Sequence, residues 1–307
     1  MADALPLFVD LDLANPALLS GAADVDVLLI TGMRDNAPVA IFSYLVPDSR
    51  VIEVRVTASE ETRRARGGCQ GVSDSDNNGN EGEYGPNLIF NNDTNGNETV
   101  QVFANYSLLS FFHQDLPRLA SMVRLVPDFP RPGIDFRHVL DIAQQPGGLA
   151  LCTSLLQSQS VGDWATVGAI ACCEAGGYVF APGLADKVNK PLVLIRDAGK
   201  IPPPNVYVAK PPSHISSLAS TNSTEARIEV DPDRVPKGAS VVVVEDVLAT
   251  GQTLCAVLEL LKKAGASTSH VSVMVVAEFP HHRGRDFLRR RGLGLVNVQS
   301  LLVFGGA

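Results

Sequence analysis

Residues 241–253, with the sequence VVVVEDVLATGQT, constrain the fold more than any other stretch of this chain. Four consecutive valines are typical of a strand that is buried on both faces of a parallel sheet. Two carboxylates, Glu245 and Asp246, follow where the strand is expected to end. A short turn then leads into residues 254–264, whose apolar periodicity predicts a helix. The stretch therefore predicts a strand, an acidic pair, a loop and a helix, in that order.

The loop of this unit is a candidate phosphate site. Backbone N–H groups and the positive end of the following helix converge there, and both favour an anion. The carboxylates of Glu245 and Asp246 can accept hydrogen bonds from paired hydroxyl groups. Together, the loop and the carboxylates predict a site for a ribose 5-phosphate group. The phosphate-binding candidates are Ala249, Thr250, Gly251, Gln252 and Thr253.

This stretch resembles the PRPP-binding signature of the phosphoribosyltransferases, which is a hydrophobic strand, two acidic residues and a loop ending Thr-Gly-x-Thr. The resemblance implies the type I phosphoribosyltransferase fold, an α/β architecture in which helices flank a parallel sheet. It also implies Glu245 and Asp246 as catalytic residues, PRPP or an AMP-like nucleotide as the ligand, Mg²⁺ accompanying PRPP, and a homodimer. An ordinary βα turn of a Rossmann-like domain is the alternative.

Residues 116–142 resemble the opening of the adenine phosphoribosyltransferases, with a helix followed by the proline-punctuated segment DFPRPGIDF. In that family the segment forms a hood over the purine base. The alternative is a surface loop that two prolines and a glycine merely punctuate. By resemblance, the base-binding residues are Phe129, Arg131, Gly133 and Ile134.

Two further segments resemble the part of the family's site that holds pyrophosphate, and both depart from the family pattern. In residues 169–182 (AIACCEAGGYVFAP), Glu174 replaces the usual aspartate and Gly176 stands where the family carries an arginine. Residues 191–204 (PLVLIRDAGKIPPP) retain Arg196 and Lys200 as pyrophosphate-binding candidates, but Asp197 stands at a lysine position. An anion at a site for a highly charged ligand repels that ligand.

The family's flexible catalytic loop, of the form Tyr-x-Leu-Glu-Tyr-Gly, is not recognisable in residues 203–230. His214 or Glu225 could replace its acid or base, or be ordinary loop residues. Two functions therefore stay open. One is a working purine phosphoribosyltransferase that converts adenine, or another 6-substituted purine, and PRPP to the nucleotide and pyrophosphate. The other is a catalytically inactive pseudoenzyme that binds AMP or another ribose 5-phosphate compound as a sensor or scaffold.

Residues 1–110 are predicted to form a separate, smaller α/β domain. Strands are expected at 25–30 and 51–56, and helices at 37–45 and 59–66. Residues 31–66 resemble part of a P-loop kinase related to nucleotide or phosphomevalonate kinases. The phosphate-loop motif G-x-x-x-x-G-K-[ST] does not occur in the chain, which argues against a nucleotide kinase. This domain is therefore interpreted as a kinase remnant used for packing, oligomerisation or partner binding.

Composition bounds the remaining possibilities. Residues 67–97 are rich in Gly, Asn, Asp and Ser, which predicts a disordered insertion with a short strand at 86–90. A chain of 307 residues accommodates that first domain and a second at 111–307. A net charge of -8 argues against nucleic acid or an anionic membrane as a partner. The N-terminal residues show no signal peptide pattern, which predicts a cytoplasmic protein. The five cysteines are scattered and odd in number, which predicts reduced thiols.

Overall fold

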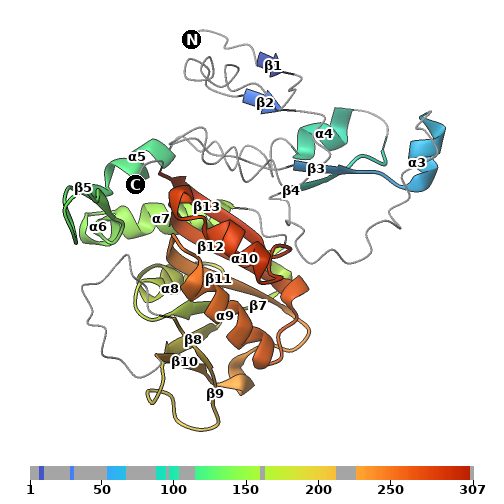
Figure 1. The fold of residues 1–307 in the computed structure, drawn as a ribbon. Helices are drawn as coiled ribbons and strands as arrows, with labels where there is room; N and C mark the ends of the chain where they lie inside the picture. The colour runs from blue at the N-terminus through green and yellow to red at the C-terminus, as the bar shows by residue number, and fades with distance from the viewer. Residues whose placement is uncertain are drawn as a thin grey trace.

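The computed structural model describes residues 7–9, 28–30, 54–66, 88–94, 97–103, 115–159, 163–211 and 226–304 (Figure 1). Several predictions made from the sequence fall outside these ranges. They concern the helix at 37–45, most of the insertion at 67–97, and the loop residues His214 and Glu225.

A seven-stranded sheet with the order β13-β12-β11-β7-β8-β10-β9 forms the centre of the C-terminal domain. The strands from β13 to β8 are parallel, whereas β10 runs antiparallel to both β8 and β9. The predicted parallel sheet is thus confirmed, with an antiparallel addition at one edge. The strands are β7 (Val167–Cys173), β8 (Leu192–Asp197), β9 (Val206–Ala209), β10 (Arg227–Val230), β11 (Ser240–Leu248), β12 (Val271–Glu278) and β13 (Asn297–Val303).

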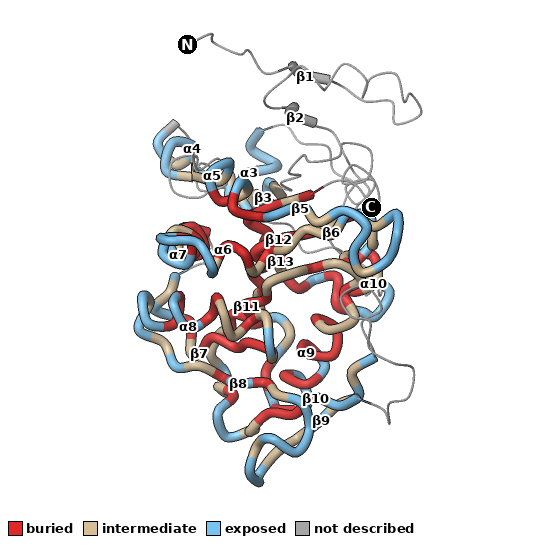
Figure 2. The backbone as a smooth tube through the Cα atoms, turned by 90° about the vertical axis from the view of Figure 1, so that its left-hand side faces the viewer, coloured by how far each residue is buried: buried red, intermediate tan, exposed pale blue. Residues whose placement is uncertain are grey.

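Helices cover both faces of this sheet. Figure 2 shows α7 and α8 on one side of the buried strands and α9 and α10 on the other. The side chains of β11 alternate between the two layers. Val241 and Val243 belong to the core that includes α9, and Val242 and Val244 to the core that includes α8. The helices are α7 (Gly148–Ser158), α8 (Gly177–Lys187), α9 (Gln252–Lys263) and α10 (Gly284–Arg290).

The valine run is the most deeply buried part of the sheet. All four side chains are 0% exposed, and burial of each stabilises the fold by about 2 kcal/mol before the loss of chain entropy is counted. Cys172 and Cys173 on neighbouring β7 are also buried, one in each core. This confirms the prediction that these cysteines face opposite sides of the strand as small core residues.

One edge of the sheet collects the ends of many strands. Because β7, β8, β11, β12 and β13 are parallel, their carboxyl ends meet at the same edge. Strand β9 is antiparallel to β10, which is antiparallel to β8, so β9 runs in the direction of β8. Its carboxyl end therefore lies on the same side. In open α/β sheets this edge is where ligands bind.

A small antiparallel hairpin precedes the sheet. Asp141 holds its base, since this carboxylate accepts a hydrogen bond from Arg124 Nε at 2.7 Å and contacts His138. The bond from Arg124 lowers the pKa of Asp141 despite partial burial. The elements are α5 (Leu116–Ser121), β5 (Arg124–Val126), β6 (Phe136–His138) and α6 (Asp141–Gln144).

Short 3-10 helices connect several of these elements. They are η5 (Trp164–Thr166), η6 (Pro232–Arg234), η7 (Thr268–His270) and η8 (Pro280–His282). Among the helices of the described residues, none is long and apolar enough to cross a membrane.

The described N-terminal residues form short α/β elements. Strand β1 (Leu7–Val9) pairs in parallel with β2 (Leu28–Ile30), and β3 (Val54–Thr57) with β4 (Leu88–Asn91). Between β3 and β4 lies α3 (Glu60–Ala65), and α4 (Asn97–Phe103) follows. The side chain of Ser59 caps α3 by accepting the N–H of Thr62, which confirms the predicted N-cap. The kinase resemblance of this region stays a prediction.

Candidate functional site

Glu245 and Asp246 occupy the carboxyl end of β11 and point to opposite faces of the sheet. Glu245 is 6% exposed, and the backbone of Cys173 acts to lower its pKa, against the larger effect of burial. Asp246 lies against the turn that begins α8. A Cβ atom at Gly176 would stand 2.1 Å from Asp246 Oδ2, so any side chain there would displace this carboxylate. The two acids thus belong to one edge but have different neighbours.

The negative charges of Glu245 and Asp246 are unfavourable when no ligand is bound. Burial raises the pKa of Glu245 well above its usual value, and the nearby charge of Asp246 raises it further. Burial also raises the pKa of Asp246. Glu245 Oε1 is buried with no hydrogen-bond partner among the described residues. Such an oxygen costs free energy unless a ligand supplies a donor or a cation.

The predicted phosphate loop connects β11 to α9. Gly251 adopts a left-handed conformation with φ +76° and caps α9, and a Cβ there would stand 2.7 Å from the carbonyl oxygen of Gly284. In turn, a Cβ at Gly284 would stand 2.4 Å from the carbonyl oxygen of Ala249. Because neither glycine has a side chain, the backbone at the start of α10 can pack directly against the backbone of the loop. In the same loop, Gln252 Oε1 is buried without a hydrogen-bond partner in the described part of the chain.

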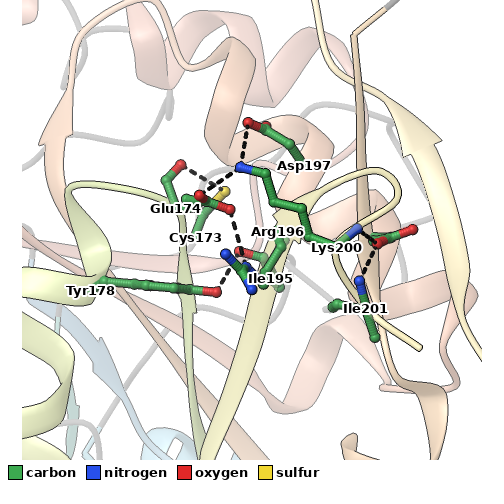
Figure 3. A network of polar contacts seen from close by, with 9 residues as sticks. Cys173, Glu174, Tyr178, Ile195, Arg196, Asp197, Lys200 and Ile201 are labelled. Carbon is green, nitrogen blue, oxygen red and sulfur yellow. Dashed lines mark hydrogen bonds and ion pairs between the residues drawn. The ribbon is translucent and has the colours of Figure 1, made fainter.

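On the neighbouring strands, Glu174 connects the two cations that the sequence assigned to pyrophosphate (Figure 3). Lys200 Nζ lies 2.7 Å from Glu174 Oε1, and Arg196 Nε lies 3.3 Å from Glu174 Oε2. Lys200 Nζ also lies 3.4 Å from Asp197 Oδ2. The hydrogen bond from Lys200 lowers the pKa of Glu174, and the same bond raises the pKa of Lys200. The four side chains form a closed group of two cations and two anions.

Glu229 on β10 fixes the backbone of Lys200. Its buried carboxylate accepts the N–H groups of Lys200 at 2.8 Å and of Ile201 at 2.6 Å. Burial acts to raise the pKa of Glu229, but hydrogen bonds from the backbone of Ile201, Gly199 and Lys200 outweigh it and lower the pKa overall. The sequence analysis missed Glu229 because only the pairing of β10 with β8 brings it to this loop.

Lys210 is a second residue that the sequence analysis missed. It follows the carboxyl end of β9, where its N–H donates to the carbonyl of Ala226 at 2.7 Å. Its positive charge acts on Glu245 and Asp246 and lowers the pKa of each, against the larger effect of burial. It forms no ion pair within the described ranges. No motif marks this lysine, since its place at the edge depends on the direction of β9.

The four base-binding candidates lie in the connection between β5 and β6. Phe129 is 43% exposed, and its ring packs edge-on against Phe136 with centroids 5.1 Å apart. The N–H of Phe129 donates to the carbonyl of Ile134 at 3.1 Å, and the N–H of Gly133 donates to Asp128 Oδ1 at 2.7 Å. Arg131 and Gly133 are exposed. The connection is therefore ordered by its own hydrogen bonds and presents an aromatic ring to solvent.

A chain of contacts places this hairpin at the same edge as the acidic pair. The guanidinium of Arg137 on β6 lies 4.4 Å from the ring centroid of Phe304, which follows β13. Phe304 stacks on Phe279, which follows β12, with centroids 5.8 Å apart. The N–H of Phe279 donates to the carbonyl of Leu248 at 2.9 Å, immediately before the phosphate loop. The structure thus brings the three predicted groups of site residues to one end of the sheet.

Comparisons with known proteins agree with this arrangement. The phosphoribosyl transferase domain model matches residues 138–290. The adenine phosphoribosyltransferase of Novosphingobium aromaticivorans is 33% identical over 192 residues, which cover 62% of this chain and 97% of the relative. The chain belongs to the adenine phosphoribosyltransferase family. The enzyme of that name from Erythrobacter litoralis is 34% identical over 188 residues, covering 61% of this chain and 97% of the relative.

Solved structures of the family share the fold. The adenine phosphoribosyltransferase of Thermoanaerobacter pseudethanolicus aligns with a TM-score of 0.50 and 26% identity, over 62% of this chain and 99% of that chain. The Giardia lamblia enzyme complexed with 9-deazaadenine aligns with a TM-score of 0.53 and 22% identity, over 64% of this chain and 99% of that chain. The second likeness shows the fold alone. The family model matches residues 138–290, which carry most of the seven-stranded sheet.

Proposed function

We propose that this member of the family binds a purine nucleoside 5'-monophosphate, such as AMP, at the carboxyl edge of the sheet. The observation that carries the proposal is the buried Glu245, whose Oε1 has no hydrogen-bond partner within the described residues, next to the half-buried Asp246 and the loop that contains Gly251. Ribose hydroxyls would donate to Glu245 and Asp246. The 5'-phosphate would accept from the loop of Ala249, Thr250, Gly251, Gln252 and Thr253.

The base would lie under the hairpin connection. Phe129 offers an exposed aromatic ring, on which a purine can stack. Arg131, Gly133 and Ile134 would complete the contact with backbone groups and apolar atoms. The relatives at 33% and 34% identity are adenine phosphoribosyltransferases, which supports an adenine-type base. A homodimer and a cytoplasmic location remain predictions that follow from the family and the sequence.

Phosphoribosyl transfer from PRPP to an adenine-type purine is the second candidate, and the named relatives favour it. Glu245 and Asp246 would then steady the positive charge that develops on the ribose. Mg²⁺ bound with PRPP takes oxygen ligands, and it commonly uses one or two carboxylates together with phosphate oxygens. The acidic pair fits that donor set and would hold the ion.

We place transfer second because of its leaving group. Pyrophosphate needs cations, and Arg196 and Lys200 are the retained candidates. Both are already paired with Glu174. Gly176 offers no cation where the family resemblance expects one, and Asp197 adds an anion. Binding of a monophosphate does not require cations at positions 176, 196 and 200, whereas transfer requires cations for its pyrophosphate leaving group.

Calorimetric titration of the full chain with AMP, and separately with PRPP and Mg²⁺, tests the proposal. We expect AMP to bind at least tenfold more tightly than adenosine, because only AMP engages the phosphate loop. We also expect 2'-deoxy-AMP to bind more weakly than AMP, since it lacks one hydroxyl for the acidic pair. No heat of binding with AMP would overturn the proposal. PRPP binding as tight as AMP binding, with pyrophosphate release on addition of adenine, would establish the second candidate instead.

A further inference from the structure

We propose that Glu174 determines which phosphate compounds this site accepts. Its carboxylate occupies the two cations that a pyrophosphate group would need, and so acts as an internal anion. The site thereby accepts a ribose 5-monophosphate and excludes compounds that also carry a pyrophosphate. This inference rests on the proposed function where it concerns nucleotides. Its claim about pyrophosphate rests on the ion-pair geometry alone.

Both oxygens of Glu174 are in use. Oε1 pairs with Lys200 and Oε2 with Arg196, so each cation already has a carboxylate partner. The side chain of Glu174 is 21% exposed, and those of Arg196 and Lys200 are 38% and 40% exposed. Partly buried pairs of this kind are screened less by salt than fully exposed pairs. An incoming pyrophosphate must therefore displace Glu174 from both partners before it can bind them.

The backbone around these side chains is held in place, which prevents the group from opening by a simple loop movement. The N–H of Glu174 donates to the carbonyl of Ile195 at 3.0 Å. The hydroxyl of Tyr178 donates to the same carbonyl at 3.1 Å. Glu229 holds the N–H of Lys200 from the other side. Figure 3 shows these contacts meeting around the strand that carries Arg196.

Asp197 reinforces the effect of Glu174. Its carboxylate lies 3.4 Å from Lys200 Nζ, so the lysine faces two anions. The formal charge of Glu174, Arg196, Asp197 and Lys200 together is zero, which leaves no excess positive charge for a ligand. At the ribose end of the edge the charges are not balanced, because neither Glu245 nor Asp246 forms an ion pair with any described residue. Selection therefore operates at the Glu174 end of the site.

The test uses inorganic pyrophosphate and AMP as probes on the full chain, measured by calorimetry at low salt. Glu174→Gln keeps the size of the side chain but removes its charge, so Lys200 and Arg196 become available. We expect pyrophosphate affinity to rise at least tenfold. AMP affinity should change less than twofold. Glu60→Gln is the matched control, since it also removes one negative charge and one Glu–Arg ion pair, with Arg64, on exposed α3. It should change neither affinity.

A further variant keeps the inference open to refutation if Glu174→Gln folds poorly. Asp197 is 55% exposed, so Asp197→Asn should fold, and we expect a smaller gain of about threefold in pyrophosphate affinity. Lys200→Gln added to Glu174→Gln should abolish the gain. An unchanged pyrophosphate affinity in folded Glu174→Gln or in Asp197→Asn would overturn the inference while leaving AMP binding intact. If the wild-type chain does not bind AMP, the proposed function is refuted instead.

Discussion

The two halves of the candidate site differ in how well the protein satisfies its own charges. At the end of β11, a buried carboxylate (Glu245) stands next to a half-buried one (Asp246), and Glu245 Oε1 has no hydrogen-bond partner among the described residues. At the ends of β7 and β8, Glu174 joins Arg196 and Lys200 in a neutral group. Without a ligand, the first half leaves a buried polar atom unsatisfied, which reduces stability. The second half satisfies its own charges without a ligand.

This difference indicates where a ligand is still required. Buried polar groups without partners reduce stability, so an unsatisfied carboxylate at an open edge is typical of a functional site. Side chains that pair with one another, as Glu174 does with Arg196 and Lys200, need no ligand to balance their charges. The chain therefore combines an incomplete ribose phosphate half with a self-contained pyrophosphate half. The following predictions test that division, beginning with the largest expected effect.

Asp246→Asn should reduce AMP affinity about 100-fold. The variant removes the charge that would strengthen hydrogen bonds from the ribose hydroxyls, and such bonds contribute about 1.5–3 kcal/mol. If the protein catalyses transfer, the same variant should abolish turnover without unfolding the chain. Calorimetry with AMP and a thermal melt measure both effects. Asp233→Asn on η6 is the control and should leave AMP affinity unchanged. Equal affinity in wild type and Asp246→Asn would mean that the ribose lies elsewhere.

Gly251→Ala should destabilise the fold by about 2–4 kcal/mol. A positive φ costs an alanine about 1–2 kcal/mol, and the new Cβ would also collide with the carbonyl of Gly284 at 2.7 Å. Gly238→Ala is a matched control, because its φ is +85° but no atom lies within 4 Å of the added Cβ. Denaturant unfolding compares the two. Equal losses would show that the contact between the loop and α10 adds nothing.

Glu245→Gln should remove a fall in stability with rising pH. Burial raises the pKa of Glu245 in the folded chain above its unfolded value of about 4.3. The folded state then binds more protons between these two pKa values, so the free energy of unfolding falls as pH rises through that interval. At pH 8 we expect the variant to be about 1 kcal/mol more stable than wild type. Unfolding curves between pH 4.5 and pH 8 would contradict this if wild type showed no decline.

Lys210→Met should weaken AMP binding about threefold. The lysine acts at longer range than an ion pair, so its contribution to the binding of an anion is modest and sensitive to salt. Lys237→Met is the control, because Lys237 lies outside the proposed site. Titrations at two salt concentrations should show the difference shrinking at high salt. A salt-independent loss would indicate a packing role for Lys210.

The sequence predicted the centre of this molecule well because one local pattern determined it. The run of valines forms a strand as predicted, but this strand continues through Glu245 and Asp246 to Leu248, beyond its expected end. The glycine of the loop then caps the following helix. The prolines and glycine of residues 127–135 marked an irregular segment, which connects β5 and β6 in the structure, whereas the hairpin itself was not predicted and the base-binding role stays a prediction. These features depend on residues close together in the chain, so their spacing carries the information.

The remaining features depend on contacts between distant segments. Nothing local indicates that Glu174 would bind both Lys200 and Arg196, because strands β7 and β8 must first pair. Lys210 reaches the edge only through the direction of β9, and Glu229 only through the pairing of β10. The alignment of Gly176 with a family arginine concerned the ligand and did not reveal that Asp246 fills the adjacent space.

Replacement of Gly176 by arginine would first disturb Asp246. In the observed conformation the new Cβ would overlap that carboxylate, at 2.1 Å from Oδ2. Such a change would displace the Asp246 carboxylate before a new cation could serve the Glu174 end of the site. The two ends of the site are therefore coupled through position 176, and a larger side chain there requires compensating changes elsewhere in the turn.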